Sequence, residues 1–135
     1  MTDKSILHSQ ILAGEFGLSI QTAAAGSSAV PSGHIYLSSG IGGSENISNE
    51  AYSLIVNRKG VSIRGSSASG VFYGVQSLRQ MISKQSDGLI IPCATIEDKP
   101  RFGWRAFLLD EGRYFKGMDV VKNLLDEMAL LKMNT

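Results

Sequence analysis

The sequence predicts an α+β fold, in which an antiparallel or mixed β-sheet carries helices on one face and is followed by one strand–loop–helix unit. Three observations support this prediction. Apolar and polar residues alternate over 52–56 and again over 61–64, which is typical of two half-buried strands. Apolar residues recur at helical spacing over 69–83 and over 118–133. Residues 104–109, WRAFLL, form a nearly unbroken apolar run, which is typical of a strand buried on both faces.

Composition limits the classes of protein to which the chain can belong. Its 135 residues are 43% hydrophobic and 19% charged, so a buried core is expected. The net charge is +1 without a basic cluster, which argues against a nucleic-acid partner. No apolar stretch approaches the roughly 20 residues of a membrane span. The single cysteine, Cys93, excludes an intrachain disulfide, and we expect it to be a buried small hydrophobe in a strand.

The first part of the chain has the weakest patterns. A helix is expected at its start, because Gly14 and Gly17 punctuate the end of an apolar stripe. We expect a helix at 3–16, a short strand at 18–22 and a loop at 23–33. A second strand at 35–38 and a flexible Gly/Ser-rich loop at 39–49 are expected to follow.

The central segment gives the clearest signals. Tyr52–Val56 and Val61–Arg64 are predicted to pair as a β-hairpin, and Gly60 suits the positive φ that its turn requires. Serines at 66–69 are candidate N-caps for the helix at 69–83. Gly70 and Gly74 weaken that helix, so we expect it to approach a sheet too closely for a Cβ.

A turn at 86–88 leads to two expected strands, Leu89–Ile91 and Cys93–Glu97, with Pro92 marking an edge or bulge between them. Asp98-Lys99-Pro100 is interpreted as a linker. We therefore place an α+β domain at 1–97 and a second unit at 98–135.

The second unit is predicted to be strand, loop and helix. Its strand occupies 104–109 and its polar loop, DEGRYFK, 110–116. The helix at 118–133 has Asp119 in its first turn and Lys132 in its last, both favourable to the helix dipole. In βα architectures the loop that follows a strand is where ligands bind.

Three motifs in this region resemble the start of the catalytic barrel of glycoside hydrolase family 20, the β-N-acetylhexosaminidases. They read D-x-P-R-F-x-W-R, L-D-x-x-R-[aromatic]-F and L-D-x-M-A-x-x-K-M-N. Upstream, GVFYGVQSL at 70–78 is similar to the helix of that family's accessory α+β domain. Two positions differ from the usual family pattern, Ala106 where glycine is common and Tyr114 where histidine is common. The matching residues are Asp98, Pro100, Arg101, Phe102, Trp104, Arg105, Leu109, Asp110, Arg113, Phe115, Leu125, Asp126, Met128, Ala129, Lys132, Met133 and Asn134.

The resemblance implies an accessory domain followed by the first βα unit of a truncated (β/α)8 barrel. It also implies another strand before the first helix, so we expect the chain to begin inside its accessory domain. A complete barrel needs about 250 residues, so we expect an N-terminal fragment of a β-N-acetylhexosaminidase. The parent enzyme would remove terminal β-linked N-acetylhexosamine by substrate-assisted retaining hydrolysis.

The resemblance also bears on the catalytic groups. The family's catalytic Asp-Glu pair lies much further along the chain, so we expect no catalytic residue here and an inactive fragment. Asp126 and Glu127, an adjacent acidic pair, are interpreted as solvated helix surface.

Arg113 is the candidate substrate-binding residue. The resemblance implies that its guanidinium hydrogen-bonds hydroxyls of the terminal N-acetylhexosamine, which suits a planar group with several donors. The alternative is a structural ion pair with Asp110 or Glu111. Asp110 and Arg105 are expected to be supporting residues that orient Arg113 and the strand end. No cofactor is expected, and neither His8 nor His34 has the spacing of a metal site.

Two functions remain open from the sequence. The first is the hexosaminidase fragment, with an N-acetylhexosamine-containing glycan as the parent's partner. The second is a non-catalytic, carbohydrate-associated or interaction module of another glycoside hydrolase. The apolar residues at 104–133 would lack neighbours in a truncated barrel, so a homo-oligomer through this segment is expected. The compartment is left open, with a periplasmic, extracellular or surface-associated parent in view.

Overall fold

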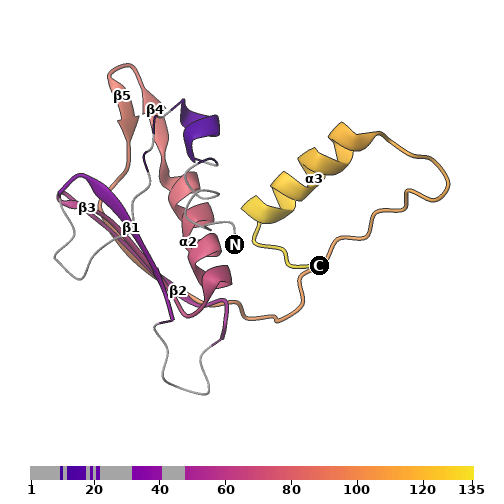
Figure 1. Cartoon of the computed structure of the whole chain (residues 1–135), viewed down its shortest axis with the longest axis horizontal. Coiled ribbons are helices and arrows are strands. Elements are labelled where there is room, and N and C mark those ends of the chain that lie inside the picture. The colour runs from indigo at the N-terminus through magenta and orange to yellow at the C-terminus, as the bar shows by residue number, and fades with distance from the viewer. Residues whose placement is uncertain (1–9, 11, 18, 20, 22–31, 41–47) are drawn as a thin grey trace. The chain divides into compact units, whose positions relative to one another are not determined.

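The computed structural model describes residues 10, 12–17, 19, 21, 32–40 and 48–135, and the chain divides into two compact units, Met1–Lys99 and Pro100–Thr135 (Figure 1). Of the predicted helix at 3–16, residue 10 and residues 12–16 are described and are helical. Of the predicted strand at 18–22, residues 19 and 21 are described, and neither lies in a strand. Most of the loops at 23–33 and 39–49 lies outside the described residues, as does His8.

Four strands form the sheet of the first unit. β1 (His34–Ser39), β2 (Tyr52–Asn57), β3 (Gly60–Gly65) and β6 (Ala94–Asp98) lie in the order β1-β3-β2-β6. β1 runs parallel to β3, whereas β2 is antiparallel to both β3 and β6. The sheet is therefore mixed, and the predicted α+β class is confirmed.

The β2–β3 hairpin follows directly from its sequence. Its predicted alternation is confirmed, because Leu54 and Ile63 are opposite each other, fully buried, on one face. The turn places Gly60 at φ 149°, and the Asn57 side chain accepts a hydrogen bond from the Lys59 amide at 2.8 Å. Glycine is favoured at such a φ because a Cβ would clash with its own backbone.

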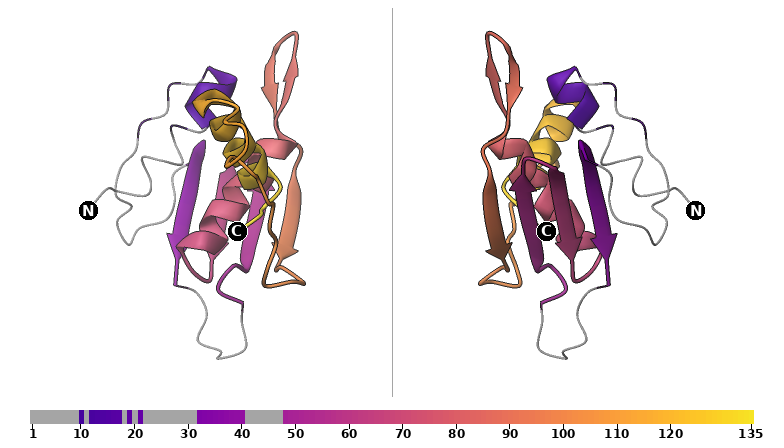
Figure 2. Two further views of the ribbon diagram at one scale, coloured as in Figure 1. Left: turned by 90° about the vertical axis from the view of Figure 1, so that its right-hand side faces the viewer. Right: turned by 90° about the vertical axis from the view of Figure 1, so that its left-hand side faces the viewer.

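Helix α2 (Ala68–Met81) covers one face of the sheet (Figure 2). Ser67 caps its start, accepting a hydrogen bond from the Ser69 amide at 3.1 Å, so one of the predicted serines is the N-cap. Val75 and Leu78 face the sheet and are 1% and 0% exposed. Burying each such side chain contributes about 1.5–3 kcal/mol to folding, which makes this helix–sheet layer the core of the unit.

The close approach predicted for Gly70 and Gly74 is confirmed. A Cβ on Gly70 would collide with the carbonyl oxygen of Ala51, and a Cβ on Gly74 would collide with the side chain of Ile63. It would also lie 3.1 Å from the Tyr52 ring. The helix backbone therefore rests directly on β2 and β3, which offsets the poor helix propensity of glycine.

The region after α2 corrects the prediction in three places. The helix ends at Met81, and residues Ser83–Gln85 form β4, a strand that was not predicted. Among the described strands β4 pairs only with β5 (Gly88–Ile90), so these residues make a separate hairpin that projects beyond the main sheet (Figures 1 and 2). Cys93 is exposed rather than buried, and it precedes β6, in which the alternate residues Thr95 and Glu97 are exposed as well.

The second unit contains helix α3 (Met118–Leu130), as predicted at its start. Asp119 lies in the first turn, but the helix ends before Lys132, which is therefore not in its last turn. Lys132 instead has φ 58°, the left-handed conformation that stops a helix and reverses the chain.

The strand predicted at 104–109 is not formed as a regular strand. Trp104 and Leu108 are 72% and 92% exposed, so the expected burial on both faces is absent. Hydrogen bonds to residues 134–135 remain: the Arg105 carbonyl accepts from the amides of Asn134 at 2.9 Å and Thr135 at 3.3 Å, and the Phe107 amide donates to the Thr135 carbonyl at 3.1 Å. An apolar run becomes a buried strand only when neighbouring strands flank it. No described strand pairs with this run.

Candidate ligand-binding loop

Two acidic side chains of the loop at 110–116 hydrogen-bond to backbone amides of the same loop. Asp110 accepts a hydrogen bond from the Gly112 amide at 3.0 Å, and Glu111 accepts one from the Lys116 amide at 2.8 Å. Glu111 was predicted as a possible partner of Arg113, but its Oε2 serves the backbone instead. Its Oε1 is buried and has no hydrogen-bond partner within the described ranges. The two carboxylates therefore shape the loop that presents Arg113.

The structure places Arg113 at the loop surface. Its side chain is 92% exposed, and its Nε lies 3.6 Å from Oδ2 of Asp110, which is itself 58% exposed. A solvated pair at this separation is worth little energetically. The pair therefore orients the guanidinium loosely, and most of its donors face solvent, where a ligand could accept from them.

Arg105 makes its contacts at the other end of the extended segment. Its Nε donates to the Lys132 carbonyl at 2.7 Å, and its Nη1 donates to the Phe102 carbonyl at 2.7 Å. These bonds hold the residues before the loop against the segment that follows α3.

Asn134 completes this contact, and sequence reasoning assigned it no role. Its side chain accepts from the Arg105 amide at 3.0 Å and donates to the Gly103 carbonyl at 2.8 Å. A side-chain amide that donates and accepts along an extended segment replaces a neighbouring strand's peptide group. The only signal in the sequence was the family motif, in which Asn134 is a matching position.

The remaining candidate groups are dispersed. Asp126 and Glu127 are exposed on α3, as expected of solvated helix surface. His34 is exposed at the start of β1, with its Nδ1 3.0 Å from the Ser32 carbonyl. Over the described ranges no three His, Cys, Asp or Glu side chains gather in a way that could hold a metal ion. Nor does a helix in those ranges have the length and apolarity to cross a bilayer.

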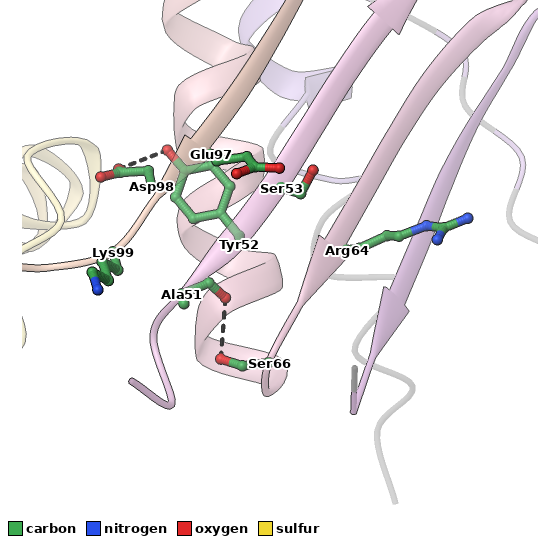
Figure 3. A pocket seen from close by; sticks show the side chains of 8 residues that line it. All are labelled: Ala51, Tyr52, Ser53, Arg64, Ser66, Glu97, Asp98 and Lys99. Carbon is green, nitrogen blue, oxygen red and sulfur yellow. Dashed lines mark hydrogen bonds between the residues drawn. The ribbon is translucent and has the colours of Figure 1, made fainter. Parts of the chain in front are cut away.

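The first unit has a shallow hollow of about 570 Å³ where β2 begins and β3 and β6 end. Figure 3 shows that its charged side chains do not converge: Arg64 points away from Glu97 and Lys99, and Asp98 turns to the Tyr52 hydroxyl. A ligand site needs polar groups aimed at one point. The hollow is lined by Ala51, Tyr52, Ser53, Arg64, Ser66, Glu97, Asp98 and Lys99.

Comparison with known proteins agrees with the resemblance found in the sequence. Residues 7–99 match the family described as "Glycosyl hydrolase family 20, domain 2", and residues 102–135 match "Glycosyl hydrolase family 20, catalytic domain". Both matches are to domains of one family of glycosyl hydrolases, and they follow each other along the chain without overlapping. The chain belongs to glycosyl hydrolase family 20.

Individual relatives support the same assignment. A beta-hexosaminidase of Porphyromonas gingivalis is 37% identical over 112 residues, which are 77% of this chain and 14% of that protein. A beta-N-acetylhexosaminidase of Cellulomonas fimi is 38% identical over 87 residues, which are 64% of this chain and 18% of that protein. The chain therefore spans less than a fifth of the length of these two relatives.

Solved structures show the same similarity in three dimensions. The N-acetyl-beta-hexosaminidase of Streptomyces plicatus, in complex with Thio-NAglucal, superposes with a TM-score of 0.79 at 32% identity, over 99% of this chain and 28% of that one. The chitobiase of Flavobacterium johnsoniae gives 0.75 at 30% identity, over 97% of this chain and 20% of that one.

Proposed function

We propose that these 135 residues supply the accessory domain, and the first strand–loop–helix unit of the catalytic barrel, to a β-N-acetylhexosaminidase. The observation that carries this proposal is the order of the two family matches, domain 2 over 7–99 and catalytic domain over 102–135. The names of the relatives, beta-hexosaminidase and beta-N-acetylhexosaminidase, support the activity. The domain boundary then lies near Lys99, where the two compact units also separate.

The substrate of the complete enzyme would be a glycan that ends in a β-linked N-acetylhexosamine. In substrate-assisted retaining hydrolysis the acetamido oxygen of the sugar attacks the anomeric carbon, while an acid protonates the leaving oxygen. Residues 1–135 do not include the carboxylates that would perform these steps. Their contribution is to binding, through the loop at 110–116.

Arg113 would bind the terminal sugar. Its exposed guanidinium, held only loosely by Asp110, can donate to two adjacent hydroxyls at once. Asp110 would limit the rotamers that Arg113 samples, and Arg105 would hold the residues before the loop through the Lys132 and Phe102 carbonyls. Each hydrogen bond from a charged donor to substrate is worth about 1.5–3 kcal/mol.

The test uses a chimera in which residues 1–135 replace the equivalent part of the Cellulomonas fimi relative. With an aryl N-acetyl-β-glucosaminide, Arg113→Ala should lower kcat/KM by roughly 10- to 100-fold, because 1.4 kcal/mol corresponds to a factor of ten. Lys116→Ala, which removes a neighbouring exposed charge, is the matched control and should change kcat/KM by less than about twofold. Equal decreases in kcat/KM for the two substitutions would show that Arg113 does not have the proposed role.

We further propose that the isolated chain self-associates through residues 104–133. Phe107, Leu108, Leu125 and Leu131 are between 50% and 92% exposed, which leaves a large apolar surface in water. Large apolar side chains exposed to this degree are normally covered by a partner or by other parts of the same protein. In a longer polypeptide the following barrel elements would cover it, and in the isolated chain a second copy would do so.

A further inference from the structure

A hydrogen-bonded chain joins the core of the first unit to its last residues. The Tyr52 hydroxyl lies 2.6 Å from the Ser77 hydroxyl on α2 and 2.9 Å from Oδ2 of Asp98 on β6 (Figure 3 shows the Asp98 contact). An ionised carboxylate only accepts, so Tyr52 donates to Asp98 and Ser77 donates to the tyrosine oxygen. The chain thus runs in one direction, from the helix through the core to the end of β6.

The tyrosine in the middle of this chain is firmly held. Tyr52 is 5% exposed, and its ring lies against Gly74, where no Cβ intervenes between helix and strand. Because Ser77 alone would give the buried hydroxyl a partner, the second contact is not needed to satisfy it. The hydrogen bond to Asp98 therefore has another role, which follows from the position of Asp98 at the end of β6.

Asp98 is the last residue of β6 and lies beside Tyr52 in the strand register. The described strands pair β6 along one side only, with β2, and the ends of such edge strands open easily. The hydrogen bond between the Tyr52 and Asp98 side chains therefore reinforces the last backbone pairing between β2 and β6. One residue, Lys99, separates Asp98 from Pro100, and a residue before proline is restricted to extended conformations.

We propose that the Tyr52–Asp98 hydrogen bond is a positioning device that fixes the direction in which the chain leaves the accessory domain. The segment from Asp98 to Pro100 is stiff, so the direction of the backbone at Pro100 is fixed only if Asp98, its first residue, is immobile. Asp98 is made immobile by a side chain rooted in the core. Asp98 and Tyr52 are thus positioning residues, and they act through the backbone of the linker.

The experiment measures local opening of the linker in the 135-residue chain by limited trypsin digestion. Lys99 is followed by proline and resists cleavage, so cleavage after Arg101 reports on the linker. Tyr52→Phe and Asp98→Ala should each accelerate this cleavage roughly tenfold, as expected when a hydrogen bond to a charged group is lost. Ser77→Ala is the matched control, since it removes a bond from the same hydroxyl without touching β6, and should change the rate by less than about twofold.

A second measurement separates local opening from loss of the fold. Amide exchange at Leu54 and Ile63, in the core of the sheet, should stay within about twofold of the wild-type rate in Asp98→Asn, which keeps an acceptor for the tyrosine. Cleavage after Arg101 in this variant should lie between the wild-type and Asp98→Ala rates. If Tyr52→Phe and Asp98→Ala leave the cleavage rate unchanged, or if Ser77→Ala accelerates it equally, the proposal is wrong.

Discussion

The Arg105 guanidinium donates to the carbonyl of Lys132, the only non-glycine residue in the described part of the chain with a positive φ. The last carbonyls of α3 are satisfied by the backbone that follows it. With Lys132 in the left-handed conformation, its amide donates to the Ala129 carbonyl at 3.1 Å and the Met133 amide donates to the Met128 carbonyl at 2.8 Å. Arg105 binds the carbonyl of the residue at which the chain reverses, and it thereby joins the start of the second unit to its end.

Arg105→Ala should release this junction. It removes two side-chain hydrogen bonds, at Lys132 and Phe102, each worth about 0.5–1.5 kcal/mol or more because the donor is charged. Amide exchange at Phe107 and Thr135 should accelerate at least roughly tenfold. Arg101→Ala is the control, since Arg101 is exposed and lies over the Phe102 ring. Similar exchange in the two variants would show that Arg105 does not hold the junction.

Gly74→Ala should destabilise the accessory domain although alanine is the better helix former. The new Cβ would collide with Ile63, and overpacking of this kind costs about 1–3 kcal/mol, against a helix-propensity gain of about 1 kcal/mol. We expect a lower free energy of unfolding in urea. Gly14→Ala, at a helical position with no atom within 4 Å of the new Cβ, should be neutral or stabilising. A Gly74→Ala variant as stable as the wild type would contradict the close packing of α2 against Ile63.

Leu125→Asp should weaken self-association of the chain. Leu125 is 56% exposed on α3, and a carboxylate there would be desolvated in any interface that buries this face. Sedimentation at tens of micromolar, a rough range for weak association, should show a shift toward monomer. Asn123→Asp adds the same charge at another exposed position of the helix and should leave association unchanged. A wild-type chain that is monomeric in this range would exclude the oligomer.

The 135 residues alone should not hydrolyse an aryl N-acetyl-β-glucosaminide. The loop that presents Arg113 is proposed to bind sugar hydroxyls, and it does not supply the acid and the acetamido-orienting carboxylate that the proposed mechanism requires. Turnover by the purified chain should equal that of buffer. Turnover that disappears in Arg113→Ala would mean that the chain holds a complete active site.

The parts of the fold that the sequence predicts well depend on local patterns. The β2–β3 hairpin is predictable because alternation and a turn glycine lie within one short segment. Helix α2 is predictable because apolar spacing and a capping serine coincide. The parallel pairing of β1 with β3 is not predictable in this way, since His34 and Gly60 meet only after the chain has passed through β2.

In the candidate site, too, local patterns are predictable from the sequence and long-range contacts are not. Arg113 is a candidate because a family motif surrounds it, and the structure shows only that its side chain is exposed. The contact between Arg105 and Asn134 joins residues 29 positions apart, and no spacing rule relates them. The apolar run at 104–109 predicted a buried strand, but burial is a property of neighbours that the run itself does not contain.

The position of β6 in the chain has a consequence for the order of events during synthesis. Every described strand of the four-stranded sheet, together with helix α2, lies between His34 and Asp98, so this layer can close as soon as Asp98 has left the ribosome. Domains generally fold in this N-terminal-first order at roughly 5–20 residues per second. The order of the residues therefore allows the sheet to begin covering its core before the apolar stretch WRAFLL emerges.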